Sequence, residues 1–150
     1  MSQSLSKIYT HLVFSTKHRE DLIPPSRKSE LFGYMAEILK AQGCPVLRIG
    51  GTLNHVHILY VQAKTKALCD TVRVLKACSS KWMNIQKGRY DLFAWQDGYG
   101  AFSISQKHVD VLTRYIENQE NHHHQTSYQN EYRRICKLYD AGLDERYAWD

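Results

Sequence analysis

Residues 46–61 read VLRIGGTLNHVHILYV and contain two runs of β-forming residues, VLRIG and HVHILYV. The runs are separated by residues 51–54, which are typical of a turn. This pattern predicts a hairpin, or a bulged pair of antiparallel strands, in the middle of the chain. We expect both strands to be largely buried, because most of their residues are apolar.

The segments on either side of this hairpin extend it into an alternating pattern of strands and helices. The expected elements are a strand over 8–15, a helix from Pro24–Pro25 to Gly43, the hairpin, a helix over 65–86, a strand over 101–104, and helices from Ser105 to about Glu120 and over 128–139. The order β-α-β-β-α-β predicts an α+β fold of the ferredoxin-like, split βαβ type. It would have one antiparallel sheet with helices on one face, followed by C-terminal helices.

Length and composition limit the class of protein. The chain has 150 residues, 43% of them apolar and 23% charged, which suits a single folded domain over residues 1–150. It contains no apolar run of the roughly 18 residues that cross a membrane, and it does not begin like a signal peptide. Its four cysteines form no CxxC pair. We therefore expect a cytoplasmic protein with free thiols and no membrane partner.

The charge balance favours a polyanionic partner. The chain carries 20 Lys plus Arg against 15 Asp plus Glu, a net charge of +5. Basic side chains that could follow a DNA backbone are Lys17, Arg19, Arg73, Lys76 and Lys81, and aromatic side chains that could stack on unpaired bases are Trp95, Tyr99 and Phe102. The alternatives are a solvated surface for the basic residues and a packed core for the aromatic ones.

Two pairs of residues are candidates for chemistry. His55 and His57 are two apart on a predicted strand, so both imidazoles lie on one face, where they can hold one divalent metal. The alternative is a pair of hydrogen-bonded histidines on a half-buried strand. Tyr115 and Gln119 are four apart on a predicted helix and project from one side of it. The alternative for Tyr115 is a partly buried helix tyrosine.

The joint arrangement of these residues resembles the HUH endonucleases. It is most similar to the single-tyrosine transposases of the smallest bacterial insertion sequences, often called transposase A, and to their repeat-associated relatives. The motifs that carry the resemblance are HLVFSTKHR (11–19), GGTLNHVHIL (50–59), LKACSSKWMN (75–84), WQDGYGAFSIS (95–105), YIENQENHH (115–123) and DERYAW (144–149). One residue departs from the pattern, since Asn54 stands where relatives more often have an acidic residue. That departure bears on the support of the histidines rather than on the ligands.

The resemblance implies a DNA transposase. It makes His55, His57 and Gln119 the ligands of Mg²⁺ or Mn²⁺, and Tyr115 the nucleophile that forms a covalent 5′-phosphotyrosine. The substrate would be single-stranded DNA with hairpins near the element ends. The enzyme would be a homodimer, with active sites that the two subunits can share, working in the bacterial cytoplasm on the nucleoid. Two imidazoles and an amide suit such an ion better than a closed structural zinc site.

Other functions are compatible with parts of the sequence. The main alternative is a domesticated, non-transposing module that binds hairpin DNA with the same fold. A second is a metal-binding ferredoxin-like domain that has no DNA partner. A histidine-triad hydrolase would need a histidine where Leu59 stands, and a zinc deaminase would need a P-C-x-x-C motif that the chain lacks.

Overall fold

A computed structural model, which describes residues 2–87, 92–119 and 126–150, shows four strands and four α-helices in these ranges. The elements are β1 (Ile8–Ser15), the 3₁₀ turn η1 (Lys17–Arg19), α1 (Lys28–Ala41), β2 (Val46–Gly51), β3 (His55–Gln62), α2 (Leu68–Lys87), β4 (Gly100–Ile104), the 3₁₀ turn η2 (Gln106–His108), α3 (Val109–Glu117) and α5 (Tyr128–Leu138). The hairpin predicted over residues 46–61 is formed by β2 and β3.

The strands form one sheet in the order β2-β3-β1-β4, and every neighbouring pair is antiparallel. Strand β3 lies between β2 and β1, so the two βα units interlock as a split βαβ fold requires. The register pairs Ser15 with His55 and Val13 with His57. The predicted α+β, ferredoxin-like fold class is therefore confirmed.

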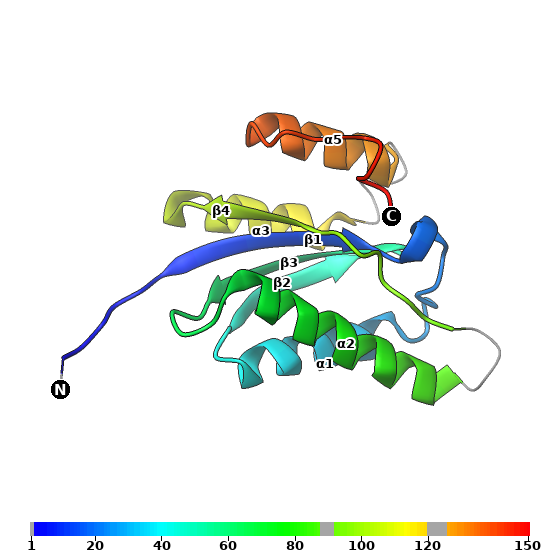
Figure 1. Ribbon diagram of the computed structural model, residues 1–150, viewed down its shortest axis with the longest axis horizontal. Helices are drawn as coiled ribbons and strands as arrows, with labels where there is room; N and C mark the ends of the chain where they lie inside the picture. Colours follow the sequence, from blue (N-terminus) through cyan, green and yellow to red (C-terminus); the bar gives the residue numbers. More distant parts are fainter. Residues whose placement is uncertain (1, 88–91, 120–125) are drawn as a thin grey trace.

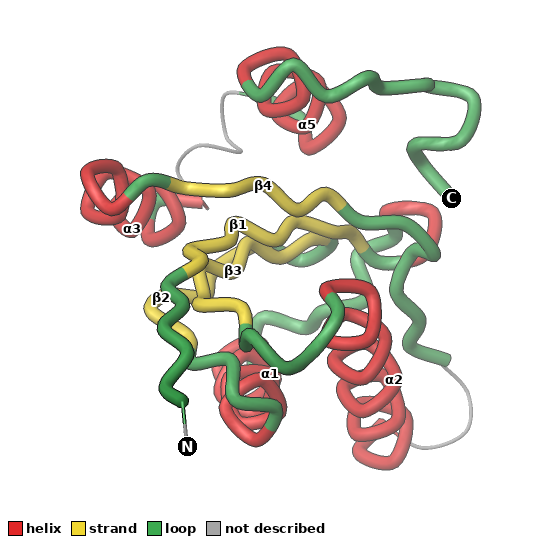
Figure 2. Tube along the Cα trace, turned by 60° about the vertical axis from the view of Figure 1, so that its left-hand side comes forward, coloured by secondary structure: helices red, strands yellow, loops and turns green. Residues whose placement is uncertain are grey.

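Helices cover both faces of the sheet. Figures 1 and 2 show α1 and α2 on one side and α5 on the opposite side, and Figure 1 shows α3 on the side of α5. Successive residues of a strand point to opposite faces of the sheet, so residues two apart share a face. Leu12 and Phe14 of β1 both join the core beneath α1 and α2. His55 and His57 face α3 and α5. The C-terminal helices thus close a second layer over the histidines.

Two glycines let this second layer approach the sheet closely. A Cβ atom on Gly50 of β2 would lie 2.5 Å from the backbone oxygen of Ile116 in α3. A Cβ atom on Gly100 of β4 would lie 2.8 Å from the hydroxyl of Tyr132 in α5. Larger side chains at these positions would push both helices away from the sheet.

The structure differs from the sequence expectations in four places, the first being helix α2, which begins at Leu68 rather than at residue 65. Strand β2 is an edge strand, so most of its residues are only partly buried or exposed rather than buried. Helix α1 begins at Lys28, because Pro24 and Pro25 belong to a turn in which the Arg27 N–H donates to the Pro24 carbonyl. The helix expected from Ser105 starts as η2 and its α-helical part ends at Glu117, and Glu120 lies outside the described residues.

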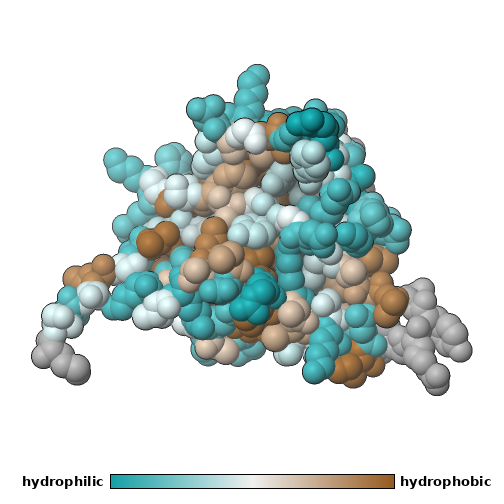
Figure 3. Space-filling view, in the orientation of Figure 1, coloured by the Kyte–Doolittle hydropathy of each residue, from teal (hydrophilic) through white to brown (hydrophobic). Residues whose placement is uncertain are grey.

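The visible surface has no large apolar area. In Figure 3, apolar side chains form small patches among hydrophilic ones. No described helix is both long and apolar enough to span a membrane.

Candidate active site

Three elements bring four polar side chains together above the sheet. His55 and His57 lie on β3, Gln119 follows the end of α3, and Glu131 lies on α5. All four are buried. The His55 Nε2 atom is 3.1 Å from Gln119 Oε1, and His57 Nε2 is 2.8 Å from Glu131 Oε1. Glu131 Oε1 also lies 3.7 Å from His55 Nε2.

These atoms form a set that fits a divalent cation. The ligand atoms of His55, His57 and Glu131 all lie within 4.8 Å of one another, and the Gln119 oxygen is beside them. Neighbouring ligand atoms around an octahedral Mg²⁺ are about 3 Å apart, because each lies about 2.1 Å from the ion. Two imidazole nitrogens and two oxygens form a mixed donor set of the kind that binds divalent metal ions. The cluster can therefore hold such an ion with little rearrangement.

Second hydrogen bonds hold each histidine with Nε2 toward the cluster. His55 Nδ1 lies 2.9 Å from Asn54 Oδ1 and 2.9 Å from Thr52 Oγ1. His57 Nδ1 lies 2.8 Å from His11 Nε2. A partner on one ring nitrogen fixes the orientation of the other, as in many metal sites. Asn54 thus supplies the acceptor for His55 although it is not acidic, so the departure from the family pattern leaves this support in place.

His11 was not among the predicted site residues. It lies on β1 with its ring stacked on that of His57, the ring centroids being 5.1 Å apart. Burial, and then the neighbouring His57, lower the pKa of His11 well below its ordinary value. The His11 ring is therefore neutral at physiological pH, and it can accept the Nδ1 proton of His57.

The hydroxyl of Tyr115 reaches the same cluster. Tyr115 lies on α3 with its ring perpendicular to that of His57, the centroids being 5.7 Å apart. Its hydroxyl donates a hydrogen bond to Glu131 Oε2. Burial, followed by the neighbouring Glu131 carboxylate, raises the pKa of Tyr115 above its ordinary value. The structure thus brings Tyr115, Gln119 and both predicted histidines together within one chain.

Two of the predicted DNA contacts lie near this cluster. Lys17 and Arg19 belong to η1, which follows the end of β1 that pairs with His55. The Asn54 side chain donates to the Arg19 carbonyl over 3.3 Å, so η1 adjoins the residue that supports His55. Lys17 pairs with Asp97 at 3.4 Å, and the Arg19 guanidinium donates to the Trp149 carbonyl at 3.0 Å.

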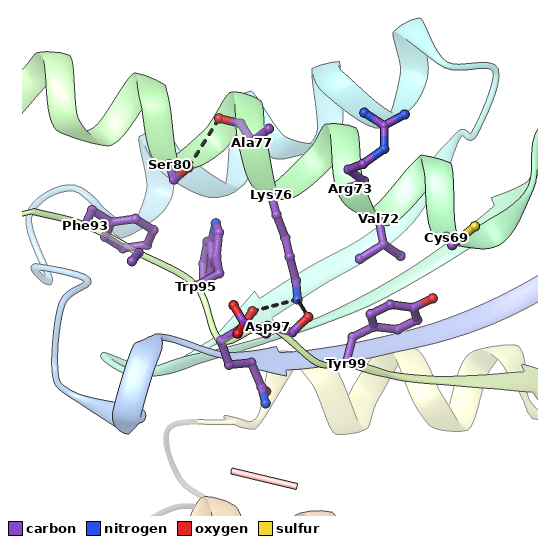
Figure 4. Close-up of a pocket in the computed structure, with 12 residues that line it drawn as sticks. Cys69, Val72, Arg73, Lys76, Ala77, Ser80, Phe93, Trp95, Asp97 and Tyr99 are labelled. Atoms are coloured by element: carbon purple, nitrogen blue, oxygen red, sulfur yellow. Dashed lines mark hydrogen bonds between the residues drawn. The ribbon is translucent and has the colours of Figure 1, made fainter. Parts of the chain in front are cut away.

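The other three predicted DNA contacts lie on α2, across the sheet. Arg73 and Lys81 are exposed there. Lys76 points toward the loop that follows Trp95, as Figure 4 shows. Its Nζ atom donates to the backbone carbonyls of Gln96, Asp97 and Gly98 at 2.9, 3.2 and 2.6 Å. Burial lowers the pKa of Lys76 to about 8. Lys76 therefore holds this loop against α2.

Two of the three aromatic residues considered for base stacking pack inside the protein. Trp95 is 6% exposed, and its indole N–H donates to Ser79 Oγ at 2.8 Å. Phe102 stacks on Tyr139 with a centroid distance of 4.7 Å. Tyr99 is partly buried beside Lys76. Their rings support the sheet and the helices on both of its faces.

Sequence reasoning missed Glu131, although a signal for it exists. Helix α5 buries Tyr128, Glu131, Ile135 and Cys136, so a carboxylate interrupts the apolar stripe of an amphipathic helix. A buried carboxylate requires partners, which is a reason to expect a site there. The partners themselves are 12 to 76 positions away in the chain and follow only from the fold.

The chain is similar to known transposases. The family model described as "Transposase IS200 like" matches residues 4–119. The ISDra2 transposase TnpA of Deinococcus radiodurans is 22% identical over 116 residues, which cover 74% of this chain and 83% of that protein. A crystal structure from Deinococcus radiodurans R1, assigned as a transposase, has a TM-score of 0.60 at 21% identity, covering 79% of this chain and 98% of that one. A REP-associated tyrosine transposase bound to a REP hairpin has a TM-score of 0.58 at 11% identity, covering 79% and 72% of the two chains.

Proposed function

Because the chain belongs to the IS200-like transposase family, we propose that it nicks and rejoins single-stranded DNA through a covalent 5′-phosphotyrosine on Tyr115. The observation that carries this proposal is the position of the Tyr115 hydroxyl within the cluster of His55, His57, Gln119 and Glu131. In this role residues 1–150 act as one domain, because β3, α3 and α5 all contribute to the site.

Mg²⁺ or Mn²⁺ would be held by His55, His57 and Gln119, with Glu131 in reach of the same position. When bound, the ion would neutralise the charge that builds on a non-bridging phosphate oxygen during attack. The protein itself provides the fixed ligands and their orientation. His11, Asn54 and Thr52 hold the two imidazoles in place for that purpose.

Tyr115 would perform the bond exchange. Its oxygen would bond to phosphorus while the bond from phosphorus to the 3′ oxygen breaks, leaving a 5′-phosphotyrosine and a free 3′-OH. The Tyr115 proton ends, in net balance, on the released 3′ oxygen. A second 3′-OH can then reverse the exchange and join a new strand. The phosphotyrosine conserves the energy of the broken bond, so rejoining needs no nucleotide cofactor.

Hairpin DNA near the element ends is the substrate that we propose. Support comes from the REP-associated tyrosine transposase, which shares the fold and was solved bound to a hairpin. The second candidate, a domesticated module that only binds hairpins, would keep this binding and lack the nucleophilic step. The positions of Tyr115 and both histidines favour the enzyme. An assay for covalent protein–DNA adducts separates the two, since only the enzyme forms them.

We propose that four basic residues contact DNA: Lys17, Arg19, Arg73 and Lys81. Lys76 is not among them, because its ammonium group already donates to three backbone carbonyls. Neutralising Lys17, Arg73 or Lys81 with Gln should reduce the slope of log K against log salt by about 0.7 for single-stranded DNA. Lys76→Gln should leave the slope unchanged. Fluorescence anisotropy at several salt concentrations measures it, and an unaltered slope removes that residue from the interface.

All the side chains of the proposed site lie together in a single chain, whereas the family resemblance implies a homodimer that can share sites. We expect each subunit of such a dimer to cleave with its own Tyr115 and His57, since these residues already lie within contact distance. Mixing His57→Gln with Tyr115→Phe protein should therefore restore no cleavage. Recovery of cleavage in the mixture would show instead that subunits exchange the helix that carries Tyr115.

A further inference from the structure

The two oxygens of the Glu131 carboxylate face different parts of the proposed active site. Oε1 lies 2.8 Å from His57 Nε2 and 3.7 Å from His55 Nε2. Oε2 accepts the hydrogen bond of the Tyr115 hydroxyl, and Gln119 Nε2 lies 3.3 Å from it. One carboxylate thus contacts both the metal-binding side chains and the nucleophile.

Burying the Glu131 carboxylate lowers the stability of the fold unless other groups replace its lost hydration. Glu131 is only 1% exposed, and it occupies a position on α5 where its neighbours on the same stripe, Tyr128 and Ile135, are apolar. A carboxylate transferred out of water loses several kcal/mol of hydration, and an apolar residue of similar size is often at least as stabilising. Stability alone therefore does not explain a glutamate here.

We propose that Glu131 is a metal ligand and positioning residue that ties the Tyr115 hydroxyl to the divalent ion. Oε1 joins the imidazoles of His55 and His57 in holding the ion, while Oε2 keeps the hydroxyl beside it. This inference rests on the proposed function and assigns a role to α5, which the family match over residues 4–119 does not include.

Because Tyr115 and the metal ion would both contact the Glu131 carboxylate, the hydrogen bond of Tyr115 should affect the affinity of the protein for the ion. The Tyr115 O–H draws electron density from Glu131, so the carboxylate is a weaker ligand while the hydrogen bond exists. Removing the hydroxyl should therefore strengthen Mn²⁺ binding, by about three- to tenfold if a typical hydrogen bond is lost. A glutamate that served only to pack α5 would show no such link.

The test is a titration of DNA-free protein with Mn²⁺. Binding is measured by calorimetry and, independently, by the electron paramagnetic resonance signal of the Mn²⁺ that stays free in solution. Glu131→Gln should weaken binding by about 10- to 100-fold. Tyr115→Phe should tighten it in the wild-type background and have no effect in the Glu131→Gln background. Asp70→Asn, which removes an exposed carboxylate on α2 across the sheet, is the control and should bind as wild type.

The isosteric Gln can still hydrogen-bond both His57 and Tyr115, so the fold should survive, and thermal unfolding checks this. If Glu131→Gln unfolds, Glu131→Asp replaces it. The shorter side chain keeps the charge but cannot span both partners, so Mn²⁺ binding should persist while its response to Tyr115→Phe disappears. Wild-type Mn²⁺ affinity in Glu131→Gln, or an equal response to Tyr115→Phe in both backgrounds, would overturn the inference. Neither result depends on DNA cleavage, whereas absence of a covalent adduct in wild type would refute the proposed function itself.

Discussion

Tyr115→Phe is expected to abolish covalent capture of DNA, by about 10³-fold or more, while hairpin affinity stays within about twofold. The substitution removes one oxygen and keeps the ring that packs against His57. The lost hydrogen bond to Glu131 leaves a buried carboxylate with fewer donors, so the free energy of unfolding should fall by about 1–3 kcal/mol. Cleavage is measured on denaturing gels, binding by anisotropy and stability by urea unfolding.

A second tyrosine provides the matched control for this substitution. Tyr147 is 71% exposed and its ring lies near Arg146, so Tyr147→Phe removes a hydroxyl outside the cluster. It should cleave like wild type. Cleavage by Tyr115→Phe at a rate near that of wild type would mean that another group attacks the phosphate.

Replacing His57 should have the second largest effect. Its Nε2 faces Glu131 and its Nδ1 faces His11, each at 2.8 Å, and the side chain is completely buried. His57→Ala removes a proposed ligand and takes one hydrogen-bond partner from each of two buried groups, the His11 ring and the Glu131 carboxylate. We therefore expect metal-dependent cleavage to fall by at least about 100-fold and the free energy of unfolding by roughly 2–4 kcal/mol.

A more conservative variant separates the loss of a ligand from the loss of stability. His57→Gln keeps a polar group in the cavity, so it should fold better than His57→Ala and still require much more Mn²⁺ for half-maximal cleavage. His108→Ala removes an exposed histidine of η2 and should behave as wild type. A metal titration curve for His57→Gln that coincides with that of wild type would refute the ligand assignment.

Much of the fold follows from local sequence patterns. Strand β1 matches the alternation expected over residues 8–15, and α5 matches the helix expected over 128–139 to within one residue. Boundaries that depend on tertiary contacts did not follow. The burial of β2 is lower than its apolar composition suggested, because its position at the sheet edge depends on how the strands order.

The candidate site is only partly visible in the sequence. Spacing alone places His55 beside His57 and Tyr115 beside Gln119, because a strand and a helix each impose a short period. His11 joins them through the register of β1 and β3, and it is 46 residues from His57 in the chain. Glu131 joins them through the packing of α5, and it is 74 residues from His57. The burial of Trp95 also depends on tertiary packing. No local sequence pattern distinguishes a buried Trp95 from an exposed one that could stack on a DNA base.

The most direct test of the central claim is a denaturing-gel adduct assay with single-stranded oligonucleotides tiled across both flanks of the native gene. Each oligonucleotide is labelled at the 3′ or the 5′ end and incubated with Mg²⁺ or Mn²⁺. A 5′-phosphotyrosine predicts a metal-dependent protein band that carries the 3′ label, forms with wild type and is missing with Tyr115→Phe. A band that carries only the 5′ label would contradict the proposed polarity. Tight hairpin binding without any covalent band would contradict the enzyme and favour the module that only binds DNA.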